Sequence, residues 1–219
     1  MKKVAIKTAV ALATTFCALG AQAGDVYGGI GFPGLTLGYA HTMNPKLVLR
    51  GEFSGGLDAS KDGKQGGVDF NGKFKAQSIG AFADYLPFSN AFRLTGGLTV
   101  NDTKFTLNSK AAAGATTTIG NSTGVNLAGE TFNMELKFPN VTPYLGIGYG
   151  FKPSNSKGWG FYGDVGFMIG KFDTTVTTSI IGKQGVTLAD VQAEAGKVRD
   201  AVSKLSALPK FSIGASYSF

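Results

Sequence analysis

The sequence predicts an all-β protein, namely an eight-stranded antiparallel transmembrane β-barrel with one helix in an extracellular loop. Apolar and small polar side chains alternate at every second residue along much of the chain, which is the spacing of a β-strand with two different faces. Of the 219 residues, 33 are glycine and only 16% are charged, against roughly 25% charged in soluble globular proteins. Short and long connections alternate between the predicted strands, as they do in membrane barrels.

The first 23 residues have the pattern of a cleaved secretory signal peptide. Lys2 and Lys3 give a positive start, a mainly apolar run follows, and Ala21-Gln22-Ala23 is a small-x-small cleavage site. The apolar run is too short for a membrane-spanning helix, which needs about 20 residues. We therefore expect residues 1–23 to be removed and residues 24–219 to form the barrel domain.

Eight segments of the remaining chain alternate in the required way. The last of them carries Phe211, Ile213, Tyr217 and Phe219 on its apolar face, with serine and glycine on the other. The same rule predicts strands at residues 26–32, 35–40, 47–54, 78–85, 92–101, 141–151, 159–170 and 211–219.

The apolar faces are predicted to contact lipid. A bilayer offers no hydrogen-bond partners, so a strand there needs both edges paired, and a closed barrel is a sheet without edges. The opposite faces carry glycine, serine, threonine and several charges, which suits an enclosed polar interior. A soluble barrel with its apolar faces turned inward is the alternative.

The connections support the same arrangement. A tight turn at Pro33-Gly34 makes the strand number even, so both termini lie on the periplasmic side. The long connections at residues 55–67, 108–130 and 174–208 then all fall on the extracellular side, where we expect loops.

Several motifs resemble the small eight-stranded outer-membrane barrels of Gram-negative bacteria. Residues 142–150 and 158–164 are similar to segments of proteobacterial barrel proteins with no settled function. Phe211, Ile213, Tyr217 and Phe219 resemble the C-terminal signal that the barrel-assembly machinery recognises. The resemblance implies a cell outer membrane location, with outer-membrane lipid, lipopolysaccharide and the assembly machinery as partners. It implies little about activity.

Five charged residues fall on the inward faces of the predicted strands. They are Arg50, Glu52, Asp84, Arg93 and Asp164. Because enclosed charges persist only when they are paired or hydrated, these residues form either a salt-bridge network that fills the lumen or a narrow polar pore. The network is the preferred interpretation.

One segment, Thr187 to Ser206, has helical periodicity. The apolar side of this helix consists of Leu188, Val191, Val198, Val202 and Leu205, and Thr187 with Asp190 is predicted to form its N-terminal cap. This apolar side is expected to pack on the loops of the barrel itself. A helix that binds a partner is the alternative.

The sequence predicts no cofactor, metal site or catalytic residue. Residues Asp58 to Asp69 imitate the oxygen spacing of a calcium loop, but lysines interrupt it, so a solvated loop is expected. His41, the single histidine, falls at the periplasmic end of its strand, so a general base is lacking where an outer-membrane enzyme would need one.

The leading functional hypothesis is therefore a non-enzymatic surface protein, structural or adhesive like a surface antigen. It would contact an extracellular protein partner through its loops. A porin-like passive channel for small or hydrophobic solutes is the alternative, and a lipid-modifying enzyme is the weakest candidate. The 21 basic residues are scattered along the chain, which argues against nucleic-acid binding.

Overall fold

The computed structural model describes residues 24–65, 68–111, 116–151 and 157–219. The predicted signal peptide lies outside these residues. The strands are β1 (Gly24–Phe32), β2 (Gly34–Asn44), β3 (Leu47–Gln65), β4 (Val68–Tyr85), β5 (Phe92–Asn101), β6 (Lys104–Ala111), β7 (Thr116–Ile119), β8 (Ser122–Asn126), β9 (Thr131–Lys137), β10 (Val141–Tyr149), β11 (Gly158–Ile169), β12 (Asp173–Thr178) and β13 (Ala207–Ser218), and the helix α2 spans Leu188–Ser203.

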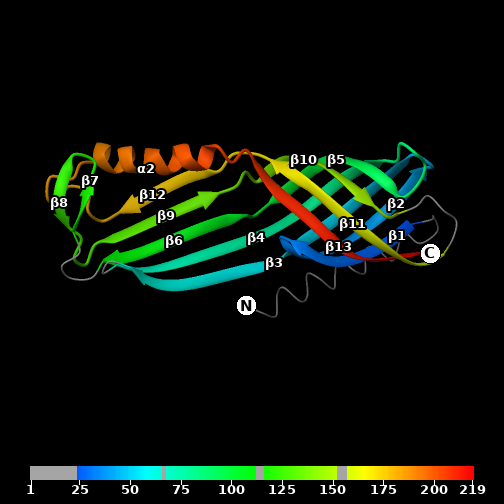
Figure 1. Ribbon diagram of the computed structural model, residues 1–219, viewed down its shortest axis with the longest axis horizontal. Helices are drawn as coiled ribbons and strands as arrows, with labels where there is room; N and C mark the ends of the chain where they lie inside the picture. Colours follow the sequence, from blue (N-terminus) through cyan, green and yellow to red (C-terminus); the bar gives the residue numbers. More distant parts are fainter. Residues whose placement is uncertain (1–23, 66–67, 112–115, 152–156) are drawn as a thin grey trace.

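Eight of the strands close into an antiparallel ring (Figure 1). Their order is β4-β3-β2-β1-β13-β11-β10-β5, and β5 pairs back onto β4. The first and last strands close the ring, with Val26 opposite Tyr217. This arrangement confirms the predicted eight-stranded barrel.

The outer face of the ring is apolar and exposed. Trp159 and Phe161 on β11 are 81% and 87% exposed, and Leu145 on β10 is 60% exposed. The residues between them in the alternation, such as Tyr144 and Tyr162, are buried inside. The alternative of a soluble barrel with apolar faces inward is therefore wrong. No helix in the described residues is long and apolar enough to span a membrane.

Beyond the ring the sheet continues as an open extension of five strands, β3-β4-β6-β9-β12. Figure 1 shows these strands projecting from the ring toward the β7–β8 hairpin. The wall formed by β1 and β2 is shorter, because β2 begins at Gly34, which pairs with Gly56 in the middle of β3. One side of the extension is consequently open.

The three predicted extracellular loops are partly wrong. Residues 55–65 belong to β3, residues 108–111 belong to β6, and residues 174–178 belong to β12. The segment from residue 108 to residue 130 also contains the β7–β8 hairpin. These strands escaped detection because their outer faces meet water rather than lipid, so they lack an apolar outer face.

The two faces of the sheet exchange character where the extension begins. On β4, Ile79 points outward and is 57% exposed, whereas Lys75 lies on the same outer face further along the strand. On the inner face, Ser78 in the ring gives way to Phe74 in the extension. The outer face is thus apolar in the ring and polar in the extension, and the inner face changes in the opposite sense.

Helix α2 begins with a capping box. The Thr187 hydroxyl accepts a hydrogen bond from the Asp190 backbone N–H, and the Asp190 carboxylate accepts one from the Thr187 N–H. The carboxylates of Asp190 and Glu194 also accept bonds from the backbone N–H groups of Asn121 and Gly120. These bonds join the start of the helix to the turn of the β7–β8 hairpin.

The predicted bounds of the helix and the predicted packing of its apolar side need correction. Val191 is buried with Val125, Ile180 and Val186, but Leu188 and Leu205 are 55% and 56% exposed. Leu205 lies beyond the helix, because α2 ends at Ser203 and the chain then leads toward β13. Val202 is half-buried, and the side chain of Val198 lies outside the described part. The helix therefore packs mainly through its first turns.

Replacing Thr187 with alanine should loosen α2. Loss of the cap costs about 1 kcal/mol of helix stability, so amide exchange across residues 188–203 should accelerate, whereas exposed Thr177→Ala should leave it unchanged. The hydrogen bond from the Thr187 side chain, the largest effect, lowers the pKa of Asp190 below its ordinary value of 3.8. The bond's stabilisation is therefore present above that value and is lost as the pH falls through the folded pKa. Unchanged exchange in Thr187→Ala would contradict this role.

Candidate functional site

The centre of the ring contains a network of buried charges around Arg50. The Arg50 guanidinium lies 2.5 Å from an Asp84 oxygen, 3.3 Å from Asp164 and 3.4 Å from Glu52. Its side chain is only 1% exposed, and the three carboxylates come from different parts of the wall. The charge on Arg50 is therefore compensated entirely within the protein.

Arg93 joins the same network from β5. Its guanidinium lies 2.7 Å from Asp164 and 3.5 Å from Asp84, and it donates a hydrogen bond to the Gly150 carbonyl at 2.8 Å. Space for this arrangement depends on Gly148. A Cβ atom there would lie 2.5 Å from an Asp164 oxygen and 2.7 Å from the Arg93 guanidinium carbon. The structure thus brings all five predicted lumen charges together.

A sixth charge, Lys210 on β13, was missed by the sequence analysis. Its ammonium lies 2.7 Å from Glu52 and donates a hydrogen bond to the Ser54 hydroxyl at 2.7 Å. Lys210 precedes Ser212 by two residues, so extending the alternation of the last strand by one step would have placed it on the inner face. With Lys210 included, three cations face three carboxylates and the network is neutral.

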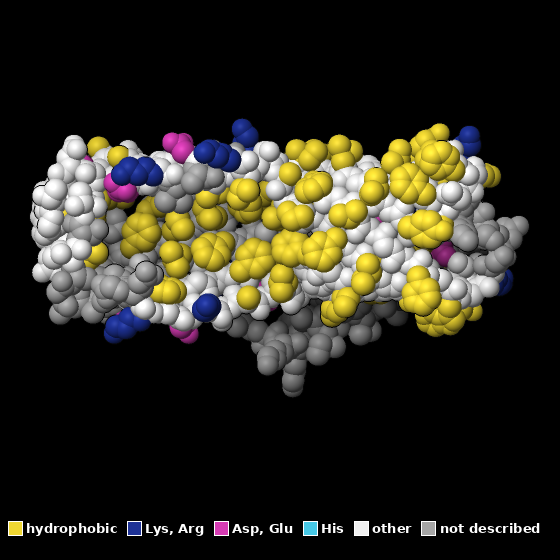
Figure 2. Space-filling view, in the orientation of Figure 1, with side chains coloured by type: hydrophobic (Ala, Val, Ile, Leu, Met, Phe, Trp, Pro, Cys, Tyr) yellow, Lys and Arg dark blue, Asp and Glu magenta, His cyan; other side chains and the backbone are white. Residues whose placement is uncertain are grey.

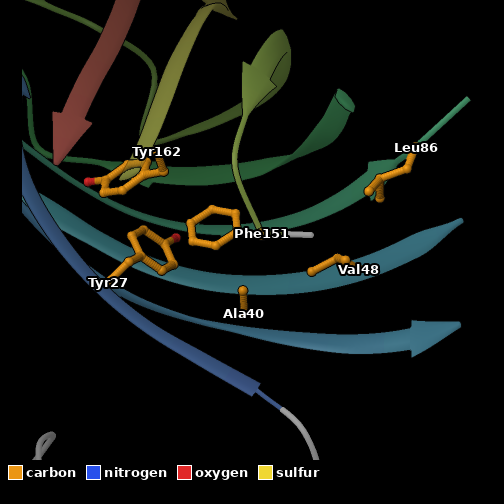
Figure 3. Packing of buried hydrophobic residues seen from close by; sticks show 6 residues of the cluster. All are labelled: Tyr27, Ala40, Val48, Leu86, Phe151 and Tyr162. Carbon is orange, nitrogen blue, oxygen red and sulfur yellow. The ribbon is translucent and has the colours of Figure 1, made fainter. Parts of the chain in front are cut away.

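Aromatic rings cover the network on the side of the chain termini. The rings of Tyr27 and Phe151 are 4.7 Å apart, and those of Tyr27 and Tyr162 are 4.9 Å apart. Figure 3 shows these three rings together inside the barrel, with Ala40, Val48 and Leu86 lining the same interior. Phe151 ends the predicted outward-facing set of residues 141–151, yet it is 4% exposed. Phe151, which follows Gly150, has a positive φ of 56°, and this backbone conformation turns its side chain inward.

A second hydrophobic layer covers the network on the side of the extension. It contains Phe82, Phe138, Tyr144 and Met168, all buried. The Arg50 guanidinium lies 5.1 Å from the centre of the Phe82 ring and 5.6 Å from that of Phe151, between the two layers. The lumen is therefore filled by a charged layer with aromatic side chains on both sides.

The other predicted sites remain apart from this network. Phe211, Ile213, Tyr217 and Phe219 lie on the exposed outer face of the ring, and their role in assembly stays a prediction. The calcium-like segment lies on the β3–β4 hairpin, where Asp62 accepts a bond from Asn71 and Asp69 pairs with Lys64. The extended backbone of this hairpin holds the carboxylate oxygens of the segment apart, unlike the curved loop that a calcium site needs. In the described residues no group of three His, Cys, Asp or Glu could hold a metal.

A shallow hollow of about 380 Å³ lies on the outer face of the extension, just beyond the apolar belt. Lys73, Lys75 and Lys104 line it. Lys75 lies 2.6 Å from Asp102, and this hydrogen bond is the main reason that the pKa of Asp102 is lowered. Basic side chains therefore follow the apolar belt at the height expected for lipid headgroups.

These features define the class of the protein. A closed ring of antiparallel strands, an apolar outer belt and a polar enclosed centre constitute the fold of an outer-membrane β-barrel. The location predicted from the sequence, the cell outer membrane, agrees with this fold.

Comparison with solved structures supports the fold assignment. The chain is similar to the crystal structure of Acinetobacter baumannii CarO2, with 20% identity, a TM-score of 0.59 and coverage of 90% of this chain and 99% of that one. It is also similar to the crystal structure of Acinetobacter baumannii CarO, with 20% identity, a TM-score of 0.56 and coverage of 89% of this chain and 97% of that one. For a major outer membrane protein from Thermus thermophilus the identity is 16%, the coverage is 91% of this chain and 100% of that one, and the TM-score is 0.44, which is too low to support an argument. No protein-family model matches the chain, and no curated protein is significantly similar in sequence.

Proposed function

We propose that the chain is a sealed, non-enzymatic outer-membrane barrel that acts as a surface-contact protein through its extracellular extension. The observation that carries the proposal is the filled lumen. Arg50 and Arg93, the two guanidinium groups at its centre, have side chains that are 1% and 0% exposed. A water-filled path would hydrate these groups, so a barrel packed in this way supports contact rather than transport.

The extension supplies the surface for that contact. Its five strands, α2 and the β7–β8 hairpin project from one end of the ring (Figure 1). Their rigid pairing presents the exposed Asn121, Gln192 and Arg199 on an ordered scaffold rather than on loops. Binding residues are commonly held in this way above a stable framework.

We also propose outer-membrane lipid and lipopolysaccharide as partners of the ring. The apolar belt matches acyl chains, and the hollow lined by Lys73, Lys75 and Lys104 matches their anionic headgroups. Recognition by the barrel-assembly machinery through the exposed Phe219 and its neighbours is a proposal of the same kind.

The refolded full chain should show no conductance above the lipid background in planar bilayers. The same protein should support adhesion of displaying cells to a surface coated with extracellular matrix protein. Replacing the β7–β8 hairpin, residues 116–126, with a short turn should reduce that adhesion and leave the bilayers silent. Sustained openings of the unmodified chain would overturn the sealed barrel and favour the narrow channel. Unchanged adhesion after the replacement would argue against a role for the hairpin in contact.

A further inference from the structure

The inner face of the extension is apolar, and among the described residues α2 packs mainly against β12 and β7 rather than over β4, β6 and β9. Phe74, Phe105 and Leu136 lie side by side on β4, β6 and β9, and Leu107 lies opposite Met134 one step further out. We call these five residues the apolar stripe. All are half-buried rather than buried. Figure 2 shows hydrophobic side chains running along this face toward the ring.

The apolar stripe is continuous with the surface that faces lipid. Phe32, at the end of β1, has its ring centre 6.1 Å from that of Phe74 and 6.5 Å from that of Phe211. Phe211 is 51% exposed on the outer belt of the ring. Phe32 thus stands at the rim where the wall of β1 and β2 ends, and it joins the inside of the extension to the bilayer.

In the part of the chain that the structure describes, the stripe is closed off from the lumen of the ring. Phe138 and Met168, both 0% exposed, lie where the extension meets the ring, and the charge network lies below them. An apolar molecule on the stripe therefore has an open side toward Phe32 and a closed floor. Its exchange with lipid would be lateral.

One cation lies on the same inner face. Among the described residues of the extension, namely residues 57–65 of β3 and 68–76 of β4 together with β6, β9 and β12, the inner face carries a single charged residue, Lys61, which pairs with Gly72. Lys64 and Lys75, on the outer face, have carboxylate partners, whereas no ion pair of Lys61 occurs in the described part of the chain. Lys61 lies two residues, about 7 Å, beyond the position opposite Phe74.

We propose that the apolar stripe holds the acyl chain of a single-chain anionic amphiphile, a long-chain carboxylate from the outer leaflet, with its headgroup at Lys61. The molecule enters and leaves over Phe32 without crossing the lumen. Continuity of the stripe with the lipid-facing belt identifies the source, and the single cation identifies the sign of the headgroup. The proposal rests on the sealed lumen described above and goes beyond surface contact.

Fluorescence quenching tests the occupant. The single native tryptophan, Trp159, faces lipid, so it is first replaced by phenylalanine. A Leu107→Trp probe then sits in the stripe, and Asn108→Trp, its neighbour on the outer face outside the lysine-lined hollow, is the matched control. With the full chain in phosphatidylcholine nanodiscs, added dibromostearate should quench the Leu107→Trp probe saturably and leave the Asn108→Trp probe largely unquenched. Met134→Trp, on the next strand, repeats the test if Leu107→Trp does not fold.

Two further variants test the headgroup and the route. Lys61→Glu should weaken dibromostearate binding about tenfold, because it reverses the charge at the headgroup. Phe32→Ser should slow transfer from preloaded bilayers about tenfold, with little change in quenching at equilibrium. Equal quenching of the probes on the two faces, or no saturable quenching, would overturn the proposed occupant. Normal transfer in Phe32→Ser would overturn the route. The quenching and transfer measurements do not depend on conductance, so the sealed barrel is tested separately by the bilayer recordings.

Discussion

Arg50→Ala should strongly destabilise the barrel. The substitution leaves Glu52, Asp84 and Asp164 with only Arg93 and Lys210 as compensating cations. Removing one partner from a buried ion pair costs about 3–5 kcal/mol, because a buried charge is left uncompensated. The free energy of unfolding, measured by urea titration in detergent micelles, should fall by that order. Arg199→Ala, which removes an exposed arginine from α2, is the matched control and should change it little.

The same substitution should open a path for ions. Arg50 lies between the rings of Phe82 and Phe151, so its removal joins the spaces on the two sides of the charged layer. The remaining network carries a net negative charge, so any current in planar bilayers should be selective for cations. A folded Arg50→Ala barrel that stays silent would show that the aromatic layers alone close the lumen.

Lys210→Met should produce a loss of similar size, and a second substitution should restore most of it. Lys210 is the nearest cation to Glu52, at 2.7 Å, and its loss leaves that carboxylate dependent on Arg50 at 3.4 Å. The cost should again be about 3–5 kcal/mol. Adding Glu52→Gln removes the uncompensated charge and keeps groups that can bond to Tyr27 and Ser54.

A double-mutant cycle measures this coupling. Urea unfolding of the two single variants, the double variant and the parent chain should give an interaction energy well above that of independent sites. Additive effects of Lys210→Met and Glu52→Gln would show that the 2.7 Å contact contributes nothing specific. Lys104→Met, which changes an outer-face lysine, controls for the loss of a positive charge.

The sealed centre and the apolar stripe have a common physical basis. Inside the ring, the inner faces of the strands carry polar and charged side chains. The charges are retained there because each has an oppositely charged partner at short distance. In the extension the outer face meets water, so the apolar side chains of Phe74 and Leu107 turn to the inner face. The protein thereby places a charged, closed region next to an open apolar one.

The sequence alone determined the strands of the ring and which of their faces meets lipid. Alternation with a period of two is a local property, and the bilayer makes the contrast between the faces large, as at Phe211 and Ser212. The same periodicity placed Arg50, Glu52, Asp84, Arg93 and Asp164 on inner faces. The capping box of α2 was equally local, since Thr187 and Asp190 are three residues apart.

Only the tertiary structure decided which inner groups meet and where the sheet remains open. Lys210 reaches Glu52 and Phe32 meets Phe74 because closure of the ring brings distant strands to the same height. Phe151 turns into the lumen through its positive φ, which the alternation pattern does not reveal. The strands of the extension escaped prediction for a related reason. Their apolar side chains, such as Phe74 and Leu107, lie on the inner face, and which face of these strands is enclosed is decided only when the sheet forms.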